Sequence, residues 1–159
     1  TAKIVGLAAI KYGDLSNQAT KDYIFDVDRF TSFEGNTGPY ILYTIVRIKS
    51  ILNRYVEAGG NLEAGEILPA SNGSEKNLML QLSGFGSMIE SAFEEKAPHK
   101  ICAYIYEVSN AFNSFYHETK ILSEENQAQK ESYIRLLQLT KRVLETSIDL
   151  LGFEAPDKM

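Results

Sequence analysis

Two tyrosines and an arginine lie close together in the stretch GNTGPYILYTIVRIKS, at residues 35–50. Tyr40, Tyr43 and Arg47 follow one another at intervals of three and then four residues, which places them on one side of an α-helix. An aromatic ring can stack on a nucleotide base, and a guanidinium can stack beside it or reach a phosphate. These side chains therefore form a candidate surface for a single-stranded nucleic acid.

The helix that carries these residues is predicted to run from about Pro39 to Tyr55, with proline in its first turn. At about 100° per residue, one sector about 60° wide holds the aliphatic residues Ile41, Ile45, Ile48 and Leu52. A second sector, centred roughly 130° away, holds Tyr40, Tyr43, Arg47 and Arg54. The tyrosines either face a ligand or pack on a neighbouring helix, with Arg47 extended along the surface or paired with a carboxylate.

The charge of the chain is acidic overall but basic along this helix. The formal net charge is −5, which argues against a general nucleic-acid coat protein, because phosphate binders usually carry a basic excess. Between Asn36 and Val56 there is no Asp or Glu, whereas Arg47, Lys49 and Arg54 are all cationic. The pattern predicts local contact with an anion rather than attraction of one from a distance.

No residue pattern predicts a catalytic or metal site. His99 and His117 both lack the Glu-x-x-His spacing of di-iron bundles, and no glycine-rich phosphate loop is present. Cys102, the single cysteine, lies in an apolar helical pattern and is predicted to be a packed thiol in a reducing, cytoplasmic setting. No apolar run approaches the roughly 18–20 residues that cross a bilayer, so no membrane partner is expected.

The elements that must position these residues are helical throughout. Residues 1–30 contain helical pieces, and a broken helix or helix pair is predicted across 75–96 with its weak point at Gly84 and Gly86. A strong helix starts at Pro98, and a last helix follows the polar link at 123–130 and stops at Gly152. We therefore predict an all-α fold, a bundle of about four to five helices.

Three stretches resemble parts of arginyl-tRNA synthetases. AAIKYGDLS, together with TKDYIFDVDRFTSFEGNTGPYILYTIVRIKSI, resembles the end of the catalytic region running into the anticodon-binding domain. AYIYEVSNAFNSFYHETKIL and LLQLTKRVLETSIDLLGFEAPDKM are similar to the rest of that domain. The resemblance implies a catalytic-region stub at 1–34 and an α-helical anticodon-binding domain at 35–159. Because the chain begins with Thr, we expect a fragment of a longer protein.

The resemblance also implies a partner and a set of site residues. In this family the helical domain binds the anticodon loop of the arginine tRNA. The resemblance implies the catalytic domain of the full-length chain as a second partner. The positions that match the family's loop-binding residues are Tyr40, Tyr43, Arg47, Asn113, Tyr116 and Met159. Met159 matches the last residue of the family, where main-chain groups take part in recognition.

The chain departs from the family pattern in two places. The Asp-Ala-Leu-Arg stretch corresponds to NQAQKESY, which puts contacts at Lys130 and Tyr133 in doubt. The HIGH-type and KMSKS-like signatures that hold ATP are absent, so ATP and arginine are expected as substrates of a full-length enzyme, with no cofactor in this fragment. The alternative from the residues alone is a helical protein–protein interaction module, whose Tyr/Arg surface would be a hot spot.

Overall fold

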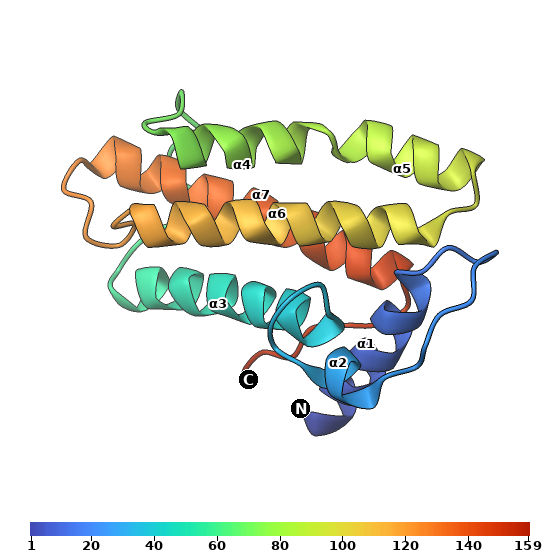
Figure 1. Ribbon diagram of the computed structural model, residues 1–159. Coiled ribbons are helices and arrows are strands. Elements are labelled where there is room, and N and C mark those ends of the chain that lie inside the picture. Colours follow the sequence, from blue (N-terminus) through green and yellow to red (C-terminus); the bar gives the residue numbers. More distant parts are fainter.

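The computed structural model describes residues 1–159 as seven α-helices with no strand. The helices are α1 (Ala2–Leu15), α2 (Val27–Thr31), α3 (Gly38–Glu57), α4 (Gly73–Ser83), α5 (Phe85–Glu94), α6 (Pro98–Glu118) and α7 (Gln127–Leu150). Helices α3 to α7 form a five-helix bundle, and α1 and α2 lie at one end of it (Figure 1). The predicted all-α fold is confirmed.

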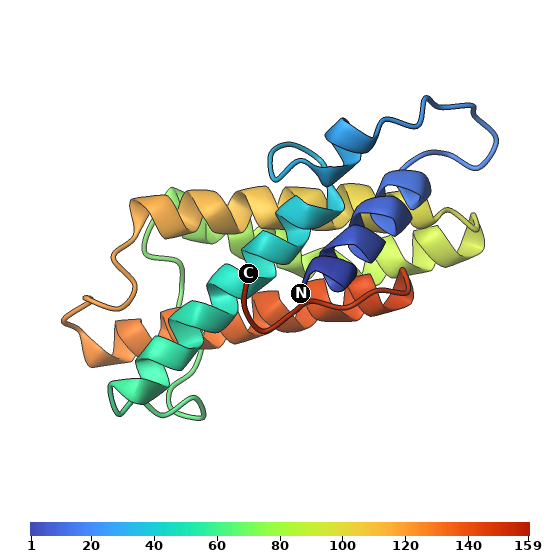
Figure 2. The ribbon, with the colours of Figure 1, turned by 90° about the horizontal axis from the view of Figure 1, so that it is seen from below.

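The bundle has α6 and α7 between two outer layers. Helices α4 and α5 follow each other along one side of α6, and α3 lies on the opposite side, packed on both α6 and α7 (Figures 1 and 2). Helix α1 packs against the first part of α3. The face shared by α3 and α6 thus brings together residues that are far apart in the sequence.

Capping side chains set where three of the long helices begin. The Thr37 hydroxyl accepts a hydrogen bond from the backbone N–H of Tyr40 at the start of α3. Asn72 caps α4 in the same way. Asn126 caps α7 by accepting from the N–H of Gln129, so that α7 begins inside the predicted polar link at 123–130. The link is shorter than predicted because its asparagine is a capping residue.

Breaks in the helical path occur where the sequence predicts them. Gly84 separates α4 from α5, and α3 and α4 are joined by the loop at 58–72. Helix α7 is followed by Gly152, whose φ of 82° lies in the left-handed region that favours glycine.

The predicted core stripe of α3 is confirmed. Ile41, Ile45 and Ile48 are fully buried, and Leu52 is 6% exposed. Cys102 on α6 is also fully buried, as the sequence predicts. Since this stripe faces the bundle, the Tyr43 sector must face away from its centre.

Helix α1 is attached to the bundle by a close backbone approach and by one hydroxyl. A Cβ at Gly38, the first residue of α3, would overlap the carbonyl oxygen of Ala8. The buried Tyr12 hydroxyl lies within hydrogen-bond distance of Asn36 Oδ1 at 2.5 Å and of the Cys102 carbonyl oxygen at 2.8 Å. These contacts hold α1 against both the start of α3 and α6. No helix combines the length and the apolar composition that a membrane crossing requires.

Candidate nucleic-acid interface

Polar and aromatic side chains from α3 and α6 meet along one edge of the bundle. The Tyr40 hydroxyl donates to Asn110 Oδ1 at 2.7 Å and accepts from Asn113 Nδ2 at 2.9 Å. Asn113 Nδ2 also lies 3.3 Å from the Thr44 hydroxyl. We call the group formed by Tyr40, Tyr43, Arg47, Asn110, Asn113 and Tyr116 the α3–α6 cluster.

The Arg47 guanidinium lies at the centre of this cluster. Its Nη1 donates to Asn113 Oδ1 at 2.7 Å, and its Nη2 donates to the Tyr43 hydroxyl at 3.1 Å. The guanidinium carbon is 4.8 Å from the centroid of the Tyr43 ring and 5.0 Å from that of Tyr116. Both distances are within the range of cation–π attraction. Two rings and one amide therefore fix the orientation of a cation.

The cluster is partly open to solvent. Tyr43 is 43% exposed, while Tyr40, Arg47, Asn113 and Tyr116 are half-buried. Behind Tyr116 the fully buried ring of Phe112 stacks at a centroid distance of 6.1 Å and an interplanar angle of 26°. The packed Phe112 ring keeps the Tyr116 ring in place, so the Tyr116 ring is already oriented when a base stacks on it.

Arg47 is the only charged member of the α3–α6 cluster. Lys49, one of the three cations of α3, pairs with Glu145 at 3.3 Å and with Asp157 at 3.5 Å. Arg47 takes part in no ion pair. Its positive charge is therefore not neutralised within the chain and remains available to an anion or an electronegative base atom.

Met159 takes part in none of the hydrogen bonds or stacking contacts of the cluster. It is 41% exposed, and the tail that carries it passes α3, where Lys49 Nζ lies 3.5 Å and 3.4 Å from the carbonyl oxygens of Ala155 and Pro156. The C-terminus lies beside α3 (Figure 2). The structure thus brings five of the six predicted residues into direct contact and places the sixth on the tail that runs along the same helix.

The two positions at which the sequence departs from the family pattern differ in their surroundings. Tyr133 is 3% exposed, packs edge-on against Phe115 at 5.4 Å, and shares a 2.9 Å hydrogen bond with the Ser71 hydroxyl. It is a core residue that a ligand cannot reach. Lys130 is half-buried beside a small cavity that Arg54 also lines.

Sequence reasoning missed three contributors to the cluster. Asn110 accepts from Tyr40, Thr44 contacts Asn113, and the Tyr106 ring packs edge-on against Tyr40 at 5.8 Å. Asn110 lies three residues before Asn113, a spacing that puts the two amides on one face of a helix. This spacing is the sequence feature from which Asn110 could have been predicted as a member of the cluster. Thr44 and Tyr106 carry no comparable signal, because their roles depend on how the two helices pack.

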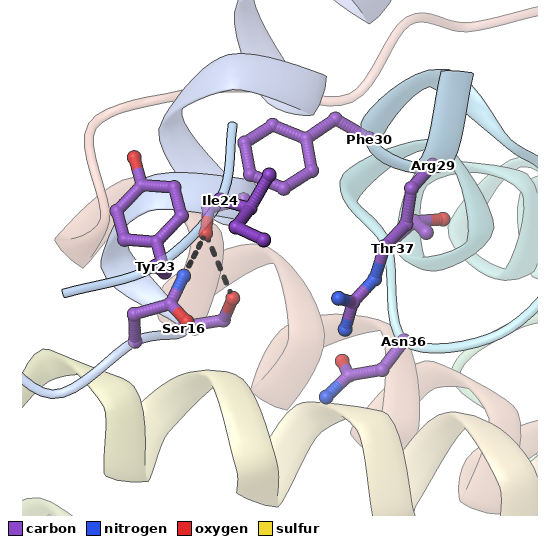
Figure 3. Close-up of a pocket in the computed structure, with 9 residues that line it drawn as sticks. Ser16, Tyr23, Ile24, Arg29, Phe30, Asn36 and Thr37 are labelled. Atoms are coloured by element: carbon purple, nitrogen blue, oxygen red, sulfur yellow. Dashed lines mark hydrogen bonds between the residues drawn. The ribbon is translucent and has the colours of Figure 1, made fainter. Parts of the chain in front are cut away.

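A cavity of about 200 Å³ between α1, α2 and the start of α3 is a weaker candidate (Figure 3). Arg29 and Asn36 point into it, but Ser16 and Asn17 both bond back to the carbonyl of Gly13 at 3.0 and 2.7 Å. Two of its polar side chains are therefore occupied by the α1 backbone.

No group of three or more His, Cys, Asp or Glu side chains is placed to hold a metal ion. The Cys102 thiol is buried, and burial raises its pKa to about 12, so that it is not a nucleophile at neutral pH. The His117 ring lies edge-on to Tyr116 at 5.6 Å.

Comparison with known proteins decides what kind of domain carries this cluster. The family described as the DALR anticodon binding domain matches residues 41–159, which include α4 to α7 and nearly all of α3. The chain belongs to this family. The α3–α6 cluster therefore lies in a DALR domain, within the matched residues except for Tyr40, which directly precedes them.

Curated relatives of this DALR domain are arginine–tRNA ligases. The chain is 71% identical over 161 residues to that of Agathobacter rectalis, and 58% identical over 155 residues to that of Alkaliphilus oremlandii. The alignments include 100% and 98% of this chain but only 27% and 26% of those proteins. The chain thus spans about a quarter of the length of these relatives.

Solved structures agree with these sequence relationships. The arginyl-tRNA synthetase of Thermus thermophilus matches 99% of this chain with a TM-score of 0.89 at 30% identity, over 27% of its own chain. That of Plasmodium falciparum matches 96% with a TM-score of 0.83 at 30% identity, also over 27% of its chain. The likeness extends beyond the DALR match to α1 and α2, because both alignments cover nearly all of the chain.

Proposed function

We propose that this chain recognises the anticodon loop of the arginine tRNA on behalf of an arginine–tRNA ligase. The observation that carries the proposal is the unpaired Arg47 guanidinium held between the rings of Tyr43 and Tyr116 on a half-open face of a DALR domain. Unstacked loop bases can stack on such rings and bond through their exposed edges, so selectivity comes from base contacts rather than from net charge.

The six residues have different parts in this proposal. Tyr43 and Tyr116 offer ring faces or edges for stacking, and Arg47 offers N–H donors and charge. Asn113 holds Arg47 in place by accepting its hydrogen bond, and Tyr40 in turn accepts from Asn113. Met159 contributes main-chain groups from the tail beside α3, which Lys49 helps to hold.

The parent protein would join arginine to its tRNA using ATP, and those substrates would bind outside this chain. In the proposal, residues 1–34 belong to the catalytic region and residues 35–159 form the anticodon-binding domain, in a cytoplasmic enzyme. Exposed apolar side chains within residues 1–34 support contact with the missing catalytic domain: Leu7, Ile10, Ile24, Phe25 and Phe33.

The test is a titration of this chain with the anticodon stem–loop of an arginine tRNA, followed by fluorescence anisotropy. A control loop altered at the middle anticodon base should bind at least about tenfold more weakly, as expected for the loss of one or two base-edge hydrogen bonds. Affinity should also fall steeply with added salt. Equal and weak affinity for both loops would contradict the proposal.

A further inference from the structure

The α3–α6 cluster contains a chain of hydrogen bonds whose direction can be deduced. A guanidinium can only donate, so the Asn113 atom that faces Arg47 at 2.7 Å must be the carbonyl oxygen, Oδ1. The Asn113 amide nitrogen therefore faces the Tyr40 hydroxyl at 2.9 Å and the Thr44 hydroxyl at 3.3 Å, and it donates to both. Arg47 thus fixes which way the Asn113 amide is turned.

The direction of the next bond follows from the first. Because the Tyr40 oxygen accepts from Asn113, its own proton is directed to the remaining partner, Asn110 Oδ1, at 2.7 Å. The Asn110 Oδ1 atom is the acceptor that ends the chain. If no acceptor were present at this position, the Tyr40 hydroxyl would keep an unpaired proton in a half-buried site, and the packing of Tyr40 beside Asn113 would weaken.

The same argument applies at the exposed end of the chain of bonds. Tyr43 accepts from Arg47 Nη2 at 3.1 Å, which leaves the proton of its hydroxyl free to point outward. Arg47 uses only some of its N–H groups on Asn113 and Tyr43, and the others have no acceptor within the chain. Tyr43 and Arg47 therefore present donors to a ligand.

We propose that Asn110 is a positioning residue: it accepts the Tyr40 proton at the end of this chain and so holds Tyr40 and Asn113 in the arrangement that orients Arg47. Arg47, together with Tyr43, thereby presents donors to an acceptor group of the bound loop. The inference rests on the proposed function and adds the chemistry of the ligand group, which is a carbonyl or ring nitrogen of a base or a phosphate oxygen. A base edge that presents only N–H groups at this point would be rejected, because two donors would face each other.

Two substitutions that are chemically identical test the direction. Asn110→Asp keeps the acceptor that Tyr40 needs, whereas Asn113→Asp replaces the donor to Tyr40 and places a carboxylate against Arg47. The two variants change the net charge equally and lie three residues apart on α6. We expect stem–loop affinity within about threefold of the unmodified chain for Asn110→Asp. For Asn113→Asp we expect a loss of tenfold or more, because the new carboxylate pairs with Arg47 and neutralises the charge that the ligand would otherwise meet.

Two further variants complete the experiment. Asn110→Ala should weaken binding about fivefold without changing the slope of log K against log salt, since no phosphate contact is lost. Tyr43→Phe removes the outward donor together with the hydroxyl that accepts from Arg47 Nη2, and it should weaken binding to a similar extent. If Tyr43→Phe loses as much affinity for the control loop with the altered middle base as for the native loop, the acceptor is a phosphate or another loop position. If Tyr43→Phe loses no affinity for the control loop, the acceptor belongs to the middle base.

Thermal melting followed by circular dichroism distinguishes a loss of stem–loop affinity from unfolding of the variant. If Asn110→Ala is unstable, the comparison of Asn110→Asp with Asn113→Asp still decides the question. Equal losses for Asn110→Asp and Asn113→Asp would overturn the assigned direction, and unchanged binding of Tyr43→Phe would overturn the outward donor. If the unmodified chain fails to distinguish the two loops, the proposed function fails first, and this inference fails with it.

Discussion

Arg47 of α3 and Asn113 of α6 lie 66 residues apart in the sequence, and Nη1 of the arginine donates to Oδ1 of the asparagine at 2.7 Å. The bond joins two helices that are each positioned by separate core contacts. The two side chains come within hydrogen-bond distance only when α3 and α6 pack together, so the cluster exists only in the folded bundle. The affinity for a ligand at this face should therefore depend on how α3 and α6 pack as well as on the cluster residues themselves.

Replacing Arg47 by lysine is expected to weaken stem–loop binding by about tenfold, although the charge is kept. An ammonium group cannot bond Asn113 and Tyr43 while also covering two rings, as the planar guanidinium does. Arg47→Ala should weaken binding further. Anisotropy titration measures both variants, and Lys76→Ala on the exposed surface of α4 is the control that loses one charge. Equal losses for Arg47→Ala and Lys76→Ala would mean that only net charge matters.

Stem–loop affinity and stability should depend on the ring of Tyr116 rather than on its hydroxyl. The ring contacts both the Arg47 guanidinium and the buried Phe112 ring, whereas its hydroxyl makes no hydrogen bond within the chain. Tyr116→Phe should therefore keep the melting temperature and most of the stem–loop affinity. Tyr116→Ala should lose about 1–3 kcal/mol of stability and at least tenfold in binding, because it removes a packed aromatic surface. A Tyr116→Phe variant that binds as weakly as Tyr116→Ala would show that the hydroxyl contacts the ligand.

The helical pattern was sufficient to predict the core stripe of α3 and the sector that holds Tyr43 and Arg47, because both depend only on spacing along one helix. Boundaries at Gly84, Pro98 and Gly152 were equally predictable from local conformational preference. The contact of Arg47 with Asn113 was not, because it depends on the relative rotation of two helices, which no local pattern encodes. The spacing of Asn110 and Asn113 indicated that the two amides share a helix face, but the function of Asn110 as an acceptor appears only with Tyr40 beside it.

The close approach of α1 to α3 should be sensitive to a single methyl group. A Cβ at Gly38 would overlap the Ala8 carbonyl, so Gly38→Ala must push α1 away from α3, with an expected loss of about 1–3 kcal/mol. Gly73 occupies the same first position in α4, and a Cβ there meets nothing within 4 Å. Urea denaturation should show Gly73→Ala to be nearly neutral. Similar stability of the two variants would mean that α1 can shift without loss.

The C-terminal tail should depend on Lys49. The Lys49 ammonium lies near two tail carbonyls and the Asp157 carboxylate, and it is also held by Glu145. Lys49→Met keeps the aliphatic stem but removes these contacts, so amide hydrogen exchange in residues 154–159 should become faster while exchange in α6 is unchanged. The matched control is Lys141→Met, which removes another partner of Glu145 without touching the tail. Unchanged tail exchange in Lys49→Met would show that Phe153 and its neighbours hold the tail alone.

Stability at alkaline pH should be limited by Cys102. Burial raises the pKa of this thiol to about 12, whereas a thiol in an unfolded chain titrates near 8.5. Between these values the unfolded state releases a proton that the folded state retains, so stability falls as pH rises, approaching about 1.4 kcal/mol per pH unit. Urea denaturation between pH 7.5 and 9, where an unfolded tyrosine with its usual pKa near 10 stays mostly protonated, measures this slope. Cys102→Ala should be flatter over the same range, and an equally steep slope in that variant would assign the loss to another group.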